Sequence, residues 1–198
     1  FYYCPSRRSP PQLSKDGDGR GSRPHEPAAL CDYAACTGDG IDAMTQWDYE
    51  TLEADGVFII GNANWPPCQG VDPDFLYDGV VYYAVKIRDI TDGTSNTILV
   101  GEKYIPAGGF GLISNYDNSI YNGDNFLTSC RFAGTGHELA RNVDEPINAN
   151  FGSVHPGVCQ FVFADGSVHA VKTEVDATIL DMMANRHDGQ KIPWDALQ

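Results

Sequence analysis

His155 and Asp165 are the residues of this chain whose types and spacing most directly suggest chemistry. Nine residues separate them, and Ser153 and Ser167 stand close by in the sequence. A histidine oriented by a carboxylate can act as a general base toward a serine hydroxyl. No Gly-x-Ser-x-Gly turn is present to expose such a serine. A hydrolase using His155 is therefore one hypothesis, and a purely structural role for the His–Asp motif is the favoured one.

The segment around this pair predicts a β-hairpin. Apolar alternating runs at Val158–Phe163 and Ser167–Val171 flank the tripeptide Ala164-Asp165-Gly166. An Asp-Gly pair between such runs indicates a tight turn, because Gly166 adopts a positive φ at little cost. Asp165 is expected to accept hydrogen bonds from nearby backbone N–H groups. His155 is expected at the entrance of the first strand.

A second polar turn precedes an apolar strand at Ile98–Val100. Its residues Asp92, Gly93 and Asn96 belong to a run of small polar side chains. Such side chains commonly bond to neighbouring backbone groups, so we predict a hydrogen-bonded turn here and no reactive site.

The remaining elements indicate an α+β fold. Val80–Ile87 and the shorter Val57–Ile60 are predicted strands, since both are rich in apolar residues suited to a sheet. Val175–Arg186 is predicted to be an amphipathic helix that stops at Asp188-Gly189. We expect a single domain over residues 1–198, with an antiparallel sheet, a packed C-terminal helix and long loops. Residues 6–30 are predicted to be a surface loop.

The six cysteines favour disulfide-stapled loops in an exported protein. Their number is even, and no Cys-x-x-Cys pair suggests a zinc ribbon. The alternative is a set of buried free thiols. The loop-rich N-terminal region favours pairing of Cys4 with the segment that holds Cys31 and Cys36. The disulfide candidates are Cys4, Cys31, Cys36, Cys68, Cys130 and Cys159.

The formal net charge of −14 argues against nucleic acid and anionic membrane surfaces as partners. The same acidity allows calcium binding, and calcium is the one cofactor that the sequence suggests. The densest set of oxygen ligands lies in the long loop, and its alternative interpretation is a solvated polar segment. The candidate calcium ligands are Asp117, Asn118, Asp124 and Asn125.

Three segments together resemble the planctomycete-type, prepilin-like H-x9-DG family. They are Ile90–Glu102, His155–Gly166 and the C-terminal helix with its Asp-Gly tail, and Phe1–Ser6 is similar to the family's Cys-Pro-Ser segment. The resemblance implies the globular head of a type IV pilin or type II secretion pseudopilin-like protein. It also implies an apolar N-terminal helix ahead of Phe1 as the only membrane connection. The chain opens at Phe1 without an initiator Met, and we interpret it as a mature or truncated product.

The resemblance implies an extracellular or cell-surface protein that associates with itself or with other pilin-like subunits into a filament or surface assembly. Two other functions stay open. One is a secreted solute- or glycan-binding module, with Trp47, Trp65 and Tyr116 as stacking platforms. The other is the extracellular hydrolase that uses His155.

Overall fold

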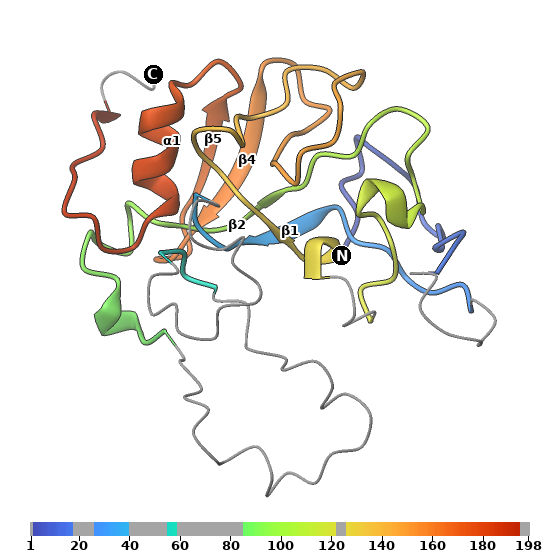
Figure 1. The fold of residues 1–198 in the computed structure, drawn as a ribbon, viewed down its shortest axis with the longest axis horizontal. Helices are drawn as coiled ribbons and strands as arrows, with labels where there is room; N and C mark the ends of the chain where they lie inside the picture. Colours follow the sequence, from blue (N-terminus) through green and yellow to red (C-terminus); the bar gives the residue numbers. More distant parts are fainter. Residues whose placement is uncertain (1, 18–25, 40–54, 59–84, 122–125, 195–198) are drawn as a thin grey trace, which may run out of the picture.

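The computed structural model describes residues 2–17, 26–39, 55–58, 85–121 and 126–194 (Figure 1). Within these residues a five-stranded sheet has the order β3-β1-β2-β4-β5, and only the β1–β3 pair is parallel. The predicted α+β class, with a mostly antiparallel sheet and a C-terminal helix, is confirmed. The strands are β1 (Tyr33–Cys36), β2 (Ile98–Glu102), β3 (Cys130–Arg131), β4 (Val158–Phe163) and β5 (Val168–Lys172).

The β4–β5 hairpin forms where the Asp-Gly turn predicts it. Its register pairs Val158 with Lys172 and Val162 with Val168. Burial alternates along β4, which turns Cys159, Phe161 and Phe163 into the core. The alternating pattern of the sequence therefore fixes which face of the hairpin is buried.

Strand β2 lies in the middle of the sheet, between β1 and β4. A Cβ atom at Gly101 would stand 2.4 Å from the Phe161 ring and 2.8 Å from the Phe151 ring. The absence of a side chain at Gly101 thus lets these two rings meet edge to face, with centroids 5.2 Å apart.

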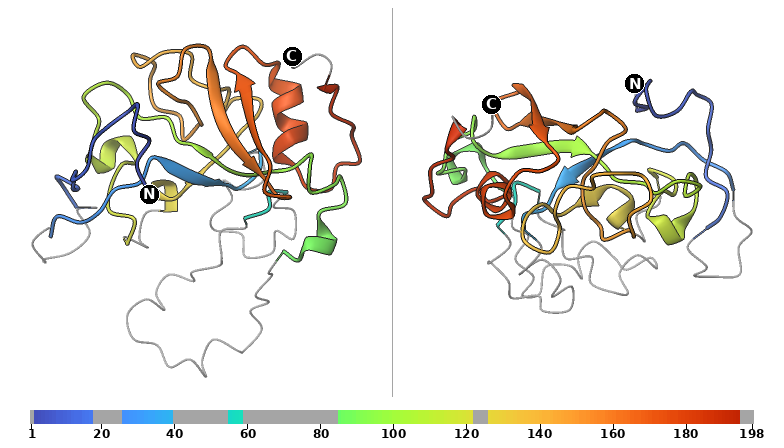
Figure 2. Two further views of the ribbon diagram at one scale, coloured as in Figure 1. Left: turned by 180° about the vertical axis from the view of Figure 1, so that it is seen from behind. Right: turned by 90° about the horizontal axis from the view of Figure 1, so that it is seen from above.

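Helix α1 (Ala177–Ala184) follows β5 and packs beside the hairpin (Figure 2). The Asp176 carboxylate accepts the backbone N–H of Thr178 and caps the first turn. Leu180, Met183 and Ala184 turn toward the sheet and join its apolar core. The predicted helix is confirmed, although it is shorter at both ends.

The predicted strand Val80–Ile87 falls mostly outside the described residues. Its described end is not a strand, because Ile87 begins a 3-10 helix, Ile87–Asp89. The Asp89 carboxylate accepts the Lys86 N–H at 2.8 Å and closes that turn. Val57 and Phe58 lie in a bend, so this half of the predicted strand Val57–Ile60 is also wrong.

Residues 103–121 and 126–152 form a long loop region with little regular structure. It contains the 3-10 helices Ile113–Asn115 and Phe126–Thr128. Isolated bridges fasten it together, among them Lys103 with Phe151 and Phe132 with Asn150. No helix among the described residues has the length and apolar character needed to span a membrane.

The predicted disulfides are wrong for the five cysteines that the structure describes. Cys4, Cys31, Cys36, Cys130 and Cys159 all carry free thiols, and Cys68 lies outside the described residues. Cys36 and Cys159 instead fill the apolar core as small buried side chains. Cys4 faces a histidine and a carboxylate rather than Cys31 or Cys36.

Candidate functional site

The two residues of the H-x9-DG motif do not meet. His155 precedes β4 and Asp165 follows it, so they stand at opposite ends of a strand about 20 Å long. Ser153 Oγ donates to the Val158 carbonyl at 2.6 Å and accepts the backbone N–H of His155 at 2.9 Å. The serine hydroxyl thus shapes the chain around His155, and this geometry does not assemble a Ser–His–Asp triad.

Asp165 shapes the hairpin turn. Its Oδ1 accepts the backbone N–H of Ser167 at 2.8 Å and the Ser167 hydroxyl at 2.6 Å. These bonds lower the pKa of Asp165. Gly166 has φ +87°, a conformation that favours glycine. The Ser167 hydroxyl, which donates to Asp165, also lies 3.0 Å from His169 Nε2.

The second polar turn fastens the C-terminal tail to the hairpin. The Asp92 carboxylate accepts the N–H groups of Asp188 and Gly189 at 2.7 and 2.9 Å. Asn96 accepts the Trp194 indole N–H at 3.1 Å, and its amide donates to the Asp92 carbonyl at 2.8 Å. Gly93 has φ +100°. Burial, with the neighbouring Asp92, raises the pKa of Asp188.

This turn also contacts the turn of the hairpin. Asp165 N donates to the Thr94 carbonyl at 3.0 Å, and Ala164 N donates to the Thr97 carbonyl at 2.9 Å. The polar turn, the hairpin turn and the C-terminal tail, which belong to the three segments of the family resemblance, are therefore joined by hydrogen bonds. The polar side chains of these turns stabilise the fold through hydrogen bonds.

His155 instead lies against Cys4 and Glu102. Its Nε2 atom is 3.6 Å from Cys4 Sγ and 3.2 Å from Glu102 Oε1. Cys4 is 2% exposed and Glu102 is 1% exposed, whereas the His155 side chain is 29% exposed. Burial raises the pKa of the Cys4 thiol, and Glu102 adds to the rise. We refer to these three residues as the Cys-Glu-His cluster.

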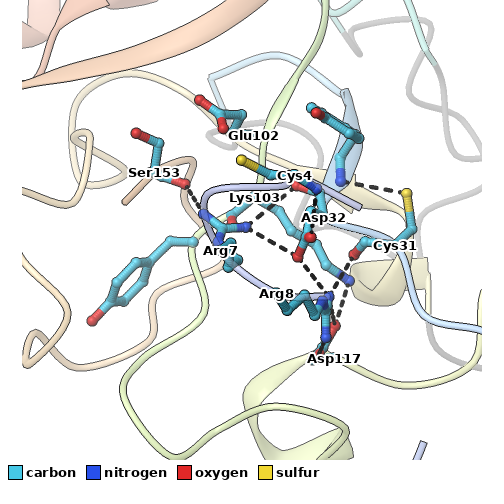
Figure 3. A network of polar contacts seen from close by, with 12 residues as sticks. Cys4, Arg7, Arg8, Cys31, Asp32, Glu102, Lys103, Asp117 and Ser153 are labelled. Carbon is cyan, nitrogen blue, oxygen red and sulfur yellow. Dashed lines mark hydrogen bonds and ion pairs between the residues drawn. The ribbon is translucent and has the colours of Figure 1, made fainter. Parts of the chain in front are cut away.

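A buried network of charged side chains lies directly beside this cluster (Figure 3). Arg8 bonds to Asp32 at 2.7 Å and to both oxygens of Asp117, at 2.7 and 3.1 Å. Lys103 Nζ lies 3.1 Å from Asp117 Oδ1. All four of these side chains have no exposed surface. We refer to the network as the charged core, and its members are Arg7, Arg8, Asp32, Lys103, Asp117 and Arg131.

Burial and pairing act against each other on the pKa values of the charged core. Burial would raise the pKa of Asp117, but the hydrogen bonds and charge of Arg8, together with Lys103, hold it below its usual range. Burial lowers the pKa of Lys103 to about 8 and that of Arg131 to about 10, against the attraction of Asp117.

Cations outnumber carboxylates in the charged core, and backbone carbonyls accept from the excess. Arg131 donates to the carbonyls of Leu127 and Cys130 and, at 3.4 Å, to those of Tyr104 and Tyr116. Lys103 donates to the Thr128 carbonyl at 3.1 Å. Arg7 donates to the carbonyls of Lys103 and Gly152 at 2.7 and 2.8 Å. These cations therefore satisfy buried carbonyl groups of the loops, of the 3-10 helix Phe126–Thr128 and of the edge strand β3.

Two members of the predicted calcium set have other partners. Both oxygens of Asp117 are engaged by the cations of the charged core, and Oδ2 also accepts the Gly111 N–H. The side-chain amide oxygen Oδ1 of Asn118 accepts the Ser119 N–H at 2.7 Å. Asp117 is therefore committed to ion pairs and is a poor calcium ligand, while Asp124 and Asn125 lie outside the described residues.

The predicted stacking platforms are only partly described. Trp47 and Trp65 lie outside the described residues. The Tyr116 ring lies under the Arg131 guanidinium, 5.7 Å from its centroid, so this ring supports the charged core.

Sequence reasoning missed both the charged core and the Cys-Glu-His cluster. The prediction of a surface loop over residues 6–30 is wrong at Arg7 and Arg8, whose side chains are 2% and 0% exposed. The available signal was a Glu-Lys pair, Glu102-Lys103, directly after an apolar strand. Adjacent residues at the end of a strand point to opposite sides, which sends Glu102 toward Cys4 and Lys103 toward Asp117.

The fold and these sites define an α+β domain whose long loops are held by buried charge. The sequence matches, over residues 1–178, the family described as "Protein of unknown function (DUF1559)", and the chain belongs to that family. No curated protein and no solved structure matches the chain.

Proposed function

We propose that this chain is the extracellular globular head of a pilin-like protein, which associates with copies of itself or with other pilin-like subunits. The observation that carries the proposal is the fastening of the N-terminal segment to the middle of the domain. Arg8 places a guanidinium with no exposed surface between two carboxylates, those of Asp32 and Asp117. A helix ahead of Phe1, which the family resemblance implies, would be attached through this anchor.

Backbone contacts strengthen the same anchor. Asp32 N donates to the Tyr2 carbonyl at 2.8 Å, and Cys4 N donates to Asp32 Oδ2 at 2.8 Å. Arg7 donates to the carbonyls of Lys103 and Gly152, which belong to the two segments joined by the Lys103–Phe151 bridge. A segment held by several buried contacts can transmit force from a preceding helix to the sheet, as an assembled subunit requires.

The polar motifs also support an architectural role. The carboxylates of Asp92 and Asp165 accept hydrogen bonds from N–H and O–H donors within the fold. Asn96 binds the backbone and Trp194. Because these polar groups are engaged by hydrogen bonds within the fold, they support a structural protein over a hydrolase.

Exposed apolar side chains near the anchor offer a contact surface for a second copy. Leu13 pairs with Ala29 through an isolated bridge, and Ile120 N donates to the Ala29 carbonyl at 2.9 Å. Leu13 and Tyr121 are both exposed, the latter at 79%. Exposed apolar residues that gather on neighbouring segments commonly mark protein contacts.

The direct test compares the chain with a longer version that carries the segment preceding Phe1 in its source. Electron microscopy and sedimentation are expected to show filaments or large assemblies for the longer protein. Surface labelling of intact cells is expected to reach it. A longer protein that remains a monomer at high concentration, or that labels only after lysis, would overturn the proposal.

The contact surface has a matched control. Tyr121→Ser and Leu13→Ser are expected to reduce assembly of the longer protein by at least severalfold while leaving the melting temperature of the head unchanged. Ile87→Ser removes an equally exposed apolar side chain elsewhere and is expected to leave assembly intact. Equal losses in all three variants would remove the special role of this surface.

A further inference from the structure

Cys4, Glu102 and His155 bring three different metal-binding groups to one point from three distant segments. Cys4 comes from the N-terminal segment, Glu102 from the end of β2, and His155 from the loop before β4. One ligand atom from each lies within 4.8 Å of the other two. We propose that the Cys-Glu-His cluster binds a zinc ion, with a fourth position open to water.

The spacing of the ligand atoms fits this metal. A tetrahedral zinc with ordinary bond lengths separates its sulfur and nitrogen ligands by about 3.5 Å and its nitrogen and oxygen ligands by about 3.3 Å. Cys4 Sγ and His155 Nε2 are 3.6 Å apart, and His155 Nε2 and Glu102 Oε1 are 3.2 Å apart. The sulfur and the carboxylate oxygen lie within 4.8 Å of each other, and zinc would draw them to about 3.6 Å.

The donor types select the metal. Calcium and magnesium prefer sites made of oxygen ligands, whereas thiolate and imidazole suit zinc. A thiolate and a carboxylate together carry two negative charges, and neutral imidazole adds none. A divalent cation therefore leaves a neutral buried site, which avoids the cost of an unpaired buried charge. Binding replaces the thiol proton by the metal and releases that proton to solvent.

Hydrogen bonds from neighbouring groups hold each of the three ligand residues in place. Glu102 Oε2 accepts the Gln160 N–H at 2.9 Å, which leaves Oε1 directed at the cluster. The His155 backbone is fixed by Ser153, and the Cys4 backbone is fixed by Asp32. Such outer contacts orient metal ligands before the metal arrives. The partial exposure of the His155 side chain leaves one side of the cluster open to solvent.

The bound metal would join the N-terminal segment to β2 and to the loop before β4. This inference does not depend on the pilin-like function, because a metal link of this kind would serve any role of the domain.

The test uses the whole chain after treatment with a chelator and reductant. Added Zn²⁺ is expected to bind at one ion per chain in calorimetry and to raise the melting temperature. Added Co²⁺ is expected to give the visible absorption of a tetrahedral site and a sulfur-to-cobalt charge-transfer band. Cys4→Ser, Glu102→Gln and His155→Asn are each expected to weaken binding at least tenfold.

Two matched variants control for other thiols and imidazoles. Cys31→Ser and His187→Ala change a cysteine and an exposed histidine outside the cluster, and both are expected to bind as the unmodified chain does. A second measurement needs no variant: Zn²⁺ is expected to slow alkylation of Cys4 at least tenfold, as mapped by mass spectrometry. Absence of uptake, uptake unchanged by the cluster variants, or alkylation unaffected by Zn²⁺ would each overturn the proposal.

Discussion

The apolar core around α1 and the charged core that includes the N-terminal segment stabilise two different kinds of backbone structure. The apolar core joins regular elements, since Leu180 and Met183 of α1 pack on residues that alternate along β4. The charged core joins mainly loop segments, whose backbone carbonyl groups accept hydrogen bonds from Lys103 and Arg131. Buried cations thus take the place that a hydrogen-bonded ladder has in the sheet.

This difference makes the two cores unequal in how they fail. An apolar core loses stability in proportion to the volume removed, and it can relax around a small cavity. A buried ion network loses far more when one partner goes, because the remaining charges stay buried without compensation. Replacing the whole network by apolar side chains of similar volume is often neutral or stabilising.

The largest expected effect is therefore that of Asp117→Asn. The change removes the charge that neutralises Arg8 and Lys103, both buried, and we expect a loss of about 3–5 kcal/mol in the free energy of unfolding. Urea denaturation followed by circular dichroism measures it. Arg88→Ala, which changes a largely exposed arginine, is the control and should cost under about 0.5 kcal/mol. Equal costs for the two variants would show that the charged core does not hold the loops.

A matching change in the apolar core is Leu180→Ala. Leu180 has no exposed surface, so its truncation is expected to cost about 2–4 kcal/mol, set by the size of the cavity left behind. Met182→Ala, at a half-buried position on the same helix, should cost clearly less by the same denaturation measurement. A Leu180→Ala cost below that of Met182→Ala would contradict the packing of α1.

The two cores also differ in how far the sequence predicts them. Alternation along Val158–Phe163 and the Asp165-Gly166 turn predict the hairpin, because strand period and turn chemistry are local properties. Arg8 and Asp117 are separated by 109 positions, and nothing local marks either as buried. The disulfide prediction is wrong for the same reason. An even number of cysteines is a property of composition, whereas a disulfide requires two thiols to meet in space.

The Cys-Glu-His cluster shows the same limit at a candidate site. The spacing to Asp165 draws attention to His155, but the partners of His155 are Cys4 and Glu102, which lie in segments far away in the sequence. The Ser167–Asp165 contact, between near neighbours, was predictable from turn chemistry alone. Contacts between residues close in the sequence could be predicted, whereas contacts between distant segments could not.

Two buried aspartates sharpen the comparison through pH. In the charged core the pKa of Asp117 is held low, whereas near the end of α1 burial, with Asp39 nearby, raises the pKa of Asp55 to about 7, although Arg186 opposes the rise. Folded Asp55 therefore keeps its proton between about pH 4 and pH 7, where the unfolded chain has lost it. By linkage, its contribution to stability is full below about pH 4 and is lost as pH rises through 7.

Asp55→Asn is expected to remove this dependence. Between pH 5 and pH 8 the unfolding free energy of the Asn variant should gain about 1–3 kcal/mol relative to the unmodified chain, measured as the difference between their denaturation midpoints at each pH. Taking the difference cancels the titration of groups that both chains share. A difference that stays constant with pH would mean that Asp55 is ionised in the folded state at neutral pH.

The smallest effect concerns the first turn of α1, where a charge acts at the border of the apolar core. Asp176→Ala removes the acceptor of the Thr178 N–H and is expected to cost about 1 kcal/mol. Asp176→Ser should recover most of that loss, because a serine hydroxyl accepts the same bond without the charge. Recovery by Ser would show that hydrogen bonding, rather than charge, is what the helix requires here. If Ser is as destabilising as Ala, the charge itself matters, and the contrast between an apolar core indifferent to charge and a core built from it would not hold at α1.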